Sequence, residues 1–127
     1  MSGFSDPLRL RVSTHDEIRT ALLRAADQAR PAELWSAPGA ACWLGPRWLR
    51  LAVSHVAAAL PAPPVWTCVL DCGDAPGLAL AAWADGQTAV ALSGTVPAPA
   101  WARMQAIATQ SGTVLLRAED GPADSFA

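Results

Sequence analysis

The sequence is poor in several residue types that mark common functional classes. It has no lysine and no tyrosine, its nine basic residues are all arginine, and charged residues make up only 16% of the chain. The arginines are scattered, whereas proteins that bind nucleic acid concentrate basic residues in a patch that often includes aromatic side chains. The net charge of −2 is too small to favour a charged partner. We therefore expect no nucleic-acid partner.

Cysteine and histidine are also too few for the sites that they commonly build. The cysteines are Cys42, Cys68 and Cys72, an odd number that does not suit a disulfide framework. The two histidines have no close Cys–His partner in the sequence, so no zinc site is predicted, and no motif indicates a cofactor. A reducing compartment, the cytoplasm, is therefore the expected location.

Long apolar runs are missing as well. Charges, prolines or strand-like breaks interrupt the chain before any run reaches the roughly 18 residues that a membrane span needs. The first residues contain no basic segment followed by an apolar one, so we expect no signal peptide. Hydrophobic residues nevertheless make up 52% of the 127 residues, which is enough for one core. We expect a single domain over residues 1–127, with 118–127 as a tail.

What the sequence does contain is a regular alternation of apolar segments and segments with helical periodicity. We expect strands at residues 8–12, 32–37, 65–70, 88–92 and 113–116, and helices at 15–30, 46–60, 75–84 and 99–110. Thr14 and Glu17 are spaced as a capping box, in which each side chain bonds the backbone amide of the other residue. Asp74 is expected to cap the third helix. Helices between successive strands predict crossovers and a mainly parallel sheet.

The predicted fold class is α/β, a three-layer sandwich around a five-stranded, mainly parallel sheet. The commonest strand order for this pattern is the flavodoxin-like order 2-1-3-4-5, and a linear order or an added N-terminal strand is the alternative. Right-handed crossovers would then place the first helix alone on one face and the other three on the opposite face. No helix is expected after the fifth strand. Part of one face would therefore be uncovered unless the tail, the N-terminal segment or a second subunit covers it.

Polar residues follow the predicted strands at the edge where open parallel sheets bind ligands. The candidate ligand-binding residues are Asp71, Cys72, Ser93, Thr95 and His15. A structural role is the alternative for each: Asp71 can cap a turn, Cys72 can be an inert buried thiol, and His15 can be an exposed residue at a helix start. The segment from Ser93 to Thr95 precedes a helix, where a phosphate or carboxylate can bind. No catalytic residue is predicted.

The position of Asp71, directly after the central strand, resembles that of the phosphate-accepting aspartate in response-regulator receivers. The resemblance implies that Ser93 and Arg117 take the places of the hydroxyl and the lysine that follow the next two strands. The chain departs from receivers at Ser13–Thr14, where they carry an acidic pair, and at Arg117, where lysine is usual. The preferred interpretation is that Asp71 caps turn amides.

The second predicted helix indicates self-association. Trp48, Leu51 and His55 form a stripe beside the one that faces the core, and the third helix has no polar side chain after its start. Exposed apolar surface of this kind commonly marks an interface. The expected function is therefore non-enzymatic and works through self-association, as a homodimer, or through a partner. The alternative is a binder of small molecules or anions, or an enzyme, with its site at the carboxyl ends of the strands.

Overall fold

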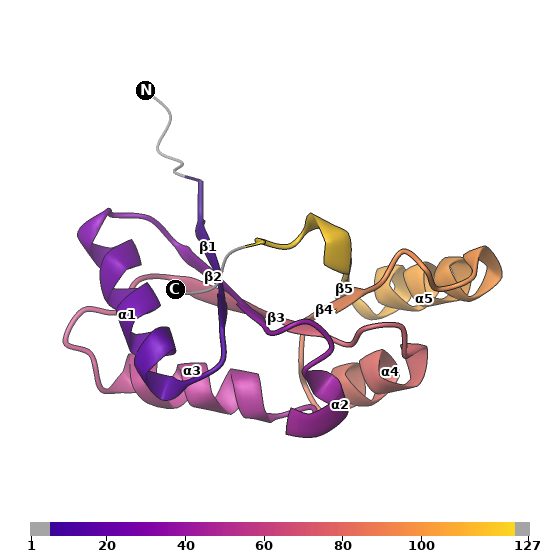
Figure 1. Cartoon of the computed structure of the whole chain (residues 1–127), viewed down its shortest axis with the longest axis horizontal. Helices are drawn as coiled ribbons and strands as arrows, with labels where there is room; N and C mark the ends of the chain where they lie inside the picture. Colours follow the sequence, from indigo (N-terminus) through magenta and orange to yellow (C-terminus); the bar gives the residue numbers. More distant parts are fainter. Residues whose placement is uncertain (1–5, 124–127) are drawn as a thin grey trace.

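The computed structural model describes residues 6–123, and within them a five-stranded, all-parallel sheet alternates with helices (Figure 1). The strands are β1 (Leu8–Val12), β2 (Ala32–Ser36), β3 (Trp66–Asp71), β4 (Ala89–Leu92) and β5 (Val114–Arg117). The helices are α1 (His15–Asp27), α2 (Ala41–Leu44), α3 (Trp48–Ala58), α4 (Pro76–Ala84) and α5 (Ala98–Ser111), and the 3-10 turn η1 (Ala118–Asp120) follows β5. The predicted α/β class with a parallel sheet is confirmed. No helix in the described part of the chain is long and apolar enough to cross a membrane.

The strand order is linear, β1-β2-β3-β4-β5, so the predicted order 2-1-3-4-5 is wrong. β1 lies at an edge and pairs in register with β2, so that Arg9 lies opposite Glu33 and their side chains form an ion pair of 2.7 Å. The physical reason is the composition of β1. It carries Arg9 and Arg11 on one face, and such a strand suits an edge better than the centre of a sheet.

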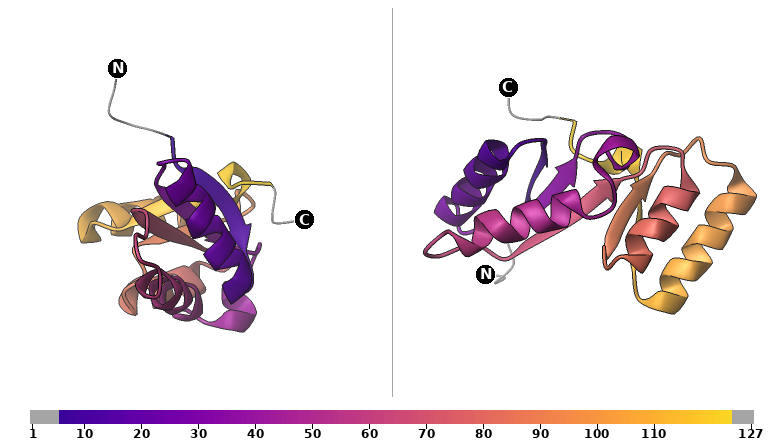
Figure 2. Two further views of the ribbon diagram at one scale, coloured as in Figure 1. Left: turned by 90° about the vertical axis from the view of Figure 1, so that its left-hand side faces the viewer. Right: turned by 90° about the horizontal axis from the view of Figure 1, so that it is seen from below.

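The linear order also decides where the helices lie. Each right-handed crossover connects neighbouring strands and therefore places its helix on the same face of the sheet. Helices α1, α3, α4 and α5 all contribute to one core on that face, and α3 crosses in front of the strands in the right-hand view of Figure 2. The expectation that α1 lies alone on the opposite face is thus wrong. α1 packs beside α3 instead.

The core fills the space between the sheet and these helices. Its largest buried side chains come from several strands and from the two helices α1 and α3: Ile18, Leu22, Leu34, Leu49, Leu70 and Leu92. Two large apolar residues of the last helix and strand stay outside the core, Ile107 with 39% and Val114 with 42% exposure. Ile107 is exposed because α5 packs through Met104 and Ala108, and Val114 belongs to an edge strand.

A thin third layer covers part of the opposite face. Residues 118–123, which we call the strap, run from the end of β5 back across the sheet (Figure 1). Trp35, Val69 and Ala91 form a small buried cluster on this face, and Ala118 of the strap packs against it. The strap is the described part of the predicted tail, and residues 124–127 lie outside the described residues.

Two predicted helix starts differ from the structure in detail. The Thr14 hydroxyl accepts a bond from the Glu17 amide at 3.1 Å, but the Glu17 carboxylate accepts from the amide of Ser13 at 2.7 Å, one residue before the expected partner. Asp74 does not cap α4. Ala75 precedes that helix without a side-chain cap, and Pro76 begins it, a residue that has no amide hydrogen to satisfy.

Candidate functional site

The carboxyl ends of the first three strands are joined by a buried ion pair between Arg11 and Asp71. Nη1 of Arg11 lies 3.1 Å from Oδ2 of Asp71, and their side chains are 10% and 2% exposed. The same Nη1 donates to the carbonyl of Ser36 at 2.8 Å. Oδ1 of Asp71 accepts from the amides of Gly39 and Gly73 at 3.0 and 2.9 Å. Asp71 therefore joins β1, the loop after β2 and its own loop after β3.

This geometry supports the structural interpretation of Asp71. A receiver aspartate must be open to a phosphate donor, whereas the Asp71 side chain is buried and accepts bonds on both oxygens. Ser93 does lie at the adjacent strand end, where its amide donates to the carbonyl of Gly73 at 2.7 Å. Its hydroxyl, however, bonds Thr95 and Glu119 rather than Asp71. The arrangement that the receiver resemblance implies is therefore not formed.

The thiol of Cys72 is also unsuited to chemistry at neutral pH. Cys72 is fully buried, and its Sγ lies 3.7 Å from the carbonyl of Leu70. Burial, together with the neighbouring charge of Asp71, raises the pKa of this thiol to about 12. Burial likewise raises the pKa of Cys68. Cys72 therefore stays protonated, and only Cys42 among the three free cysteines is exposed.

The loop after β4 holds a carboxylate that comes from the strap. The amide of Gly94 donates to both oxygens of Glu119, at 2.9 and 3.1 Å, and the Ser93 hydroxyl lies 3.2 Å from Oε2. The hydroxyls of Ser93 and Thr95 are 2.9 Å apart. Hydrogen bonds from the backbone, first that of Glu119 and then that of Gly94, lower the pKa of Glu119, as do Ser93 and the charge of Arg117. The segment predicted to bind an anion therefore binds one from its own chain.

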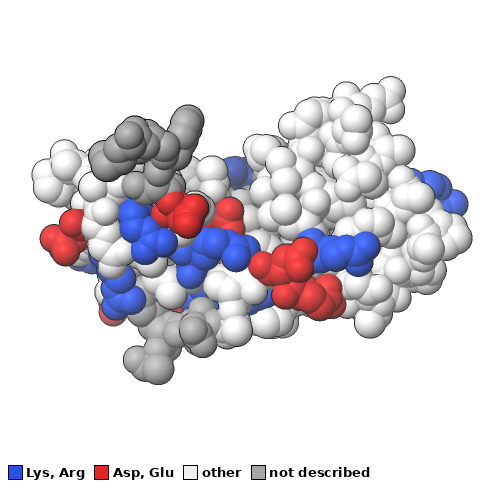
Figure 3. Space-filling view, turned by 90° about the horizontal axis from the view of Figure 1, so that it is seen from above, with Lys and Arg blue, Asp and Glu red and all other residues white. Residues whose placement is uncertain are grey.

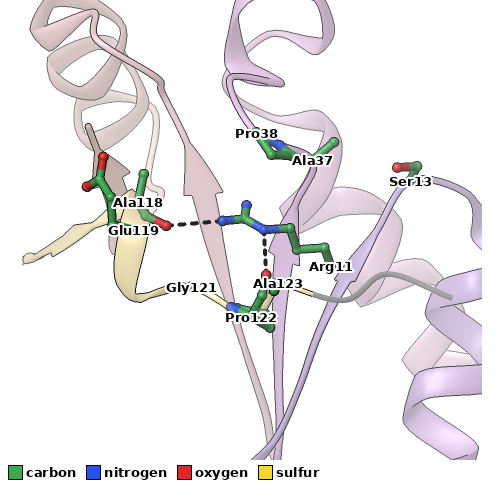
Figure 4. Close-up of a pocket in the computed structure, with 9 residues that line it drawn as sticks. All are labelled: Arg11, Ser13, Ala37, Pro38, Ala118, Glu119, Gly121, Pro122 and Ala123. Carbon is green, nitrogen blue, oxygen red and sulfur yellow. Dashed lines mark hydrogen bonds between the residues drawn. The ribbon is translucent and has the colours of Figure 1, made fainter. Parts of the chain in front are cut away.

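A cavity of about 360 Å³ lies between the strap and the loops after β1 and β2 (Figure 4). Its lining residues are Arg11, Ser13, Ala37, Pro38, Ala118, Glu119, Gly121, Pro122 and Ala123. The Arg11 guanidinium projects toward the strap and donates to two of its carbonyls, those of Pro122 at 2.9 Å and Ala118 at 3.2 Å. Arg11 thus connects the buried ion pair to the strap.

Arg11 and Glu119 were not predicted as site residues. Arg11 lies in a strand that alternates apolar and basic residues, and that pattern normally places the arginine in solvent. Glu119 lies in the segment expected to be a tail. One feature of the sequence could have indicated Arg11. The predicted helices leave part of one sheet face uncovered, and a guanidinium on that face needs hydrogen-bond partners once another segment of the chain covers it.

Charge is confined to a narrow part of this side of the molecule. The guanidinium carbons of Arg9 and Arg11 lie 5.5 and 5.2 Å from the centre of the Trp35 ring. Arg9 also donates to the carbonyl of Asp120 at 2.8 Å. Seen from the strap side, the charged residues form a band with uncharged surface on both sides (Figure 3).

A separate hollow of about 520 Å³ lies toward the amino ends of the strands, where Val69, Val114 and several other residues line it.

His15 does not belong to the carboxyl-edge cluster. Its ring centre lies 6.2 Å from that of Trp48 and 6.4 Å from that of His55, both in edge-to-face orientation. It therefore joins the predicted interface residues on α3. We call His15, Trp48, Leu51 and His55 the α1–α3 patch. Leu51 is 55% exposed, and both histidines are exposed.

The polar side of α3 is fixed to another helix. Nε of Arg47 lies 2.9 Å from Asp85, and Nη2 of Arg50 donates to the carbonyl of Asp85 at 2.9 Å and to its carboxylate at 3.3 Å. Hydrogen bonds from Arg47 and then Arg50 lower the pKa of Asp85. With its core side buried and its basic side bound to the end of α4, α3 presents the α1–α3 patch outward.

Comparison of the chain with family models, characterised proteins and solved structures gives no significant match. Its function is therefore inferred from the two surfaces described above, the carboxyl edge and the α1–α3 patch.

Proposed function

We propose that the protein acts without catalysis, by associating with a second copy of itself through the α1–α3 patch. The observation that carries this proposal is the 55% exposure of Leu51 between Trp48 and His55 on the outward side of α3. Large exposed apolar side chains that form one stripe are typical of interfaces, whereas scattered ones are ordinary on monomers.

The other sides of α3 support this choice of surface. Leu49, Val53 and Val56 face the core and are buried, and Arg47 and Arg50 are bound to Asp85. The patch lies on the remaining side of α3, where His15 of α1 meets Trp48 and His55 and where Leu51 is 55% exposed. An isologous contact between two copies of α3 would place Leu51 of each copy near the centre of the interface, as a two-fold axis requires.

The bonding of the polar groups at the carboxyl edge also supports this proposal. Asp71 accepts from the amides of Gly39 and Gly73, and Glu119 accepts from the Gly94 amide and the Ser93 hydroxyl, so these groups are bonded within the described chain. We assign these groups a structural role and place the function on the helices. A reducing compartment such as the cytoplasm suits the proposal, because Cys42 is a free thiol on the surface.

The test is sedimentation velocity from 1 to 100 µM, with two matched variants. Leu51→Glu should leave a monomer of 13.2 kDa at every concentration, because it places a charge at the centre of the contact. Leu80→Glu changes a leucine of 41% exposure on α4 and should leave the dimer intact. A wild-type protein that stays monomeric at 100 µM would overturn the proposal.

A second candidate function is the binding of a small anion at the carboxyl edge. It is favoured by one observation, the Glu119 carboxylate bound in the loop of Ser93 and Gly94 beside the 360 Å³ cavity. Glu119→Gln removes that charge and should let phosphate or succinate bind in a calorimetric titration. If neither ion binds this variant at millimolar concentration, the loop serves only to hold the strap.

A further inference from the structure

The two histidines of the chain, far apart in the sequence, meet on the surface of the α1–α3 patch. His15 is the first residue of α1, and His55 lies in the last turn of α3. The two helices pack against each other and bring the two ring centres within 6.4 Å. Both rings are exposed and can be reached by a dissolved ion.

This separation is close to that of two imidazoles on one zinc ion. A zinc–nitrogen bond of about 2.0–2.1 Å places each ring centre roughly 3.2 Å from the metal, and two ligands at a tetrahedral angle then have ring centres about 5 Å apart. The observed distance is a little longer than that. Side-chain rotation can close the gap, because exposed histidines change rotamer without moving the backbone.

The charges around the two rings permit a cation. Arg47, directly before α3, and Arg50, within it, are bound to Asp85. On α1, the acidic residues Asp16 and Glu17 follow His15 directly and oppose the positive end of the helix. Arg19, one turn further on, is exposed, so water and salt screen its charge.

Two imidazoles complete only half of a zinc coordination sphere. Structural zinc takes four protein ligands, and no group of three His, Cys, Asp or Glu within residues 6–123 could hold a metal ion. A second copy related by a two-fold axis through the α1–α3 patch would present the same two histidines. The missing ligands are then those of the partner, and the site is incomplete without it.

We infer that His15 and His55 form half of a zinc site that bridges two copies of the chain. The inference rests on the proposed self-association through the α1–α3 patch and names an ion that strengthens it. Zinc is the ion of choice because imidazole nitrogen is one of its preferred ligands and it has no redox chemistry of its own. Only ligation is involved: each neutral ring donates a nitrogen lone pair, and no electron is transferred.

The experiment uses tag-free protein that carries Cys42→Ser, so that neither a histidine tag nor the exposed thiol binds metal. Calorimetric titration with zinc chloride should give one zinc per two chains. Sedimentation with 100 µM zinc should show a dimer constant at least about tenfold tighter than with EDTA. Magnesium, which prefers oxygen ligands, should have no effect.

His15→Gln and His55→Gln separate the inference from the proposed function. Each variant should lose the response to zinc but keep the metal-free self-association, which Leu51→Glu removes. If the metal-free dimer forms and zinc leaves it unchanged, the proposed function stands and the zinc site is wrong. If zinc binds one per chain and the protein stays monomeric, the bridging site is wrong. An unchanged response to zinc in both glutamine variants would also overturn it.

Discussion

Arg11 and Asp71 form an ion pair that spans a strand, because Arg11 lies on β1, Asp71 on β3, and β2 runs between them. The guanidinium crosses the end of β2 and donates to the carbonyl of Ser36 on the way. A buried pair with this many bonds is costly to break, because the remaining partner keeps its charge without compensation.

Asp71→Asn should therefore lower the free energy of unfolding by about 3–5 kcal/mol, the range for a buried pair that loses one partner. Urea unfolding followed by tryptophan fluorescence measures this. Arg47→Ala, which breaks a pair whose arginine is 68% exposed, is the control and should cost less than about 1 kcal/mol. Equal losses in the two variants would mean that the Arg11–Asp71 pair is not the structural centre of this edge.

Gly121→Ala should detach the strap. A Cβ at this position would lie 2.6 Å from Nη2 of Arg11 and 2.8 Å from two ring carbons of Trp35, and Trp35 is fully buried. We expect a loss of about 1–3 kcal/mol, as for other overpacked sites, and faster amide hydrogen exchange in residues 118–123. Gly77→Ala has no atom within 4 Å of the new Cβ and should be neutral or slightly stabilising. Slow exchange of the strap in Gly121→Ala would contradict its tight packing.

The three thiols should react very differently with a disulfide reagent at pH 8. Cys42 is exposed and should react within minutes, whereas Cys68 and Cys72 are buried and their raised pKa values keep them protonated. Native protein should therefore release about one equivalent of chromophore, Cys42→Ser almost none, and urea-unfolded protein three. Rapid reaction of a second thiol in the native protein would show that the core opens more readily than its packing implies.

Acid should weaken the attachment of the strap through Glu119. Its pKa is lowered in the folded chain, so the stability that it contributes is complete above the ordinary carboxyl range near 4.3 and is lost as the pH falls through the lower folded value. Glu119→Gln should therefore lose less stability than wild type between pH 6 and pH 3. Thermal unfolding at several pH values tests this. Parallel pH profiles would show that Glu119 is not favoured in its charged form.

The sequence was informative where local patterns decide structure. The apolar segments locate each strand to within one residue, and Thr14 and Glu17 mark the start of α1. The strand order cannot be derived from local patterns, because it depends on which strands pair with each other in the folded chain. The basic residues Arg9 and Arg11 favour an edge position for the first strand, whereas the commonest strand order for this pattern places that strand inside the sheet.

For the candidate site, too, some features follow from the sequence pattern and others depend on the strand order. Asp71 and Ser93 lie at adjacent strand ends, as the strand pattern implies. The pairing of Asp71 with Arg11 could not be read from the sequence, because it depends on β1 and β3 flanking β2. The meeting of His15 with His55 depends on α1 and α3 sharing one face, which the expected strand order excluded.

The strap also bears on the order in which the chain folds. In a linear sheet every strand pairs only with its neighbours in sequence, so each strand–helix unit can add to a finished edge without displacing an earlier one. The bonds from Arg9 and Arg11 to the strap are different, because they join residues 107 to 111 positions apart. Contacts of such long range form late, since their loop-closure entropy must first be overcome. We therefore expect the last described residues to close onto the first strand late in folding.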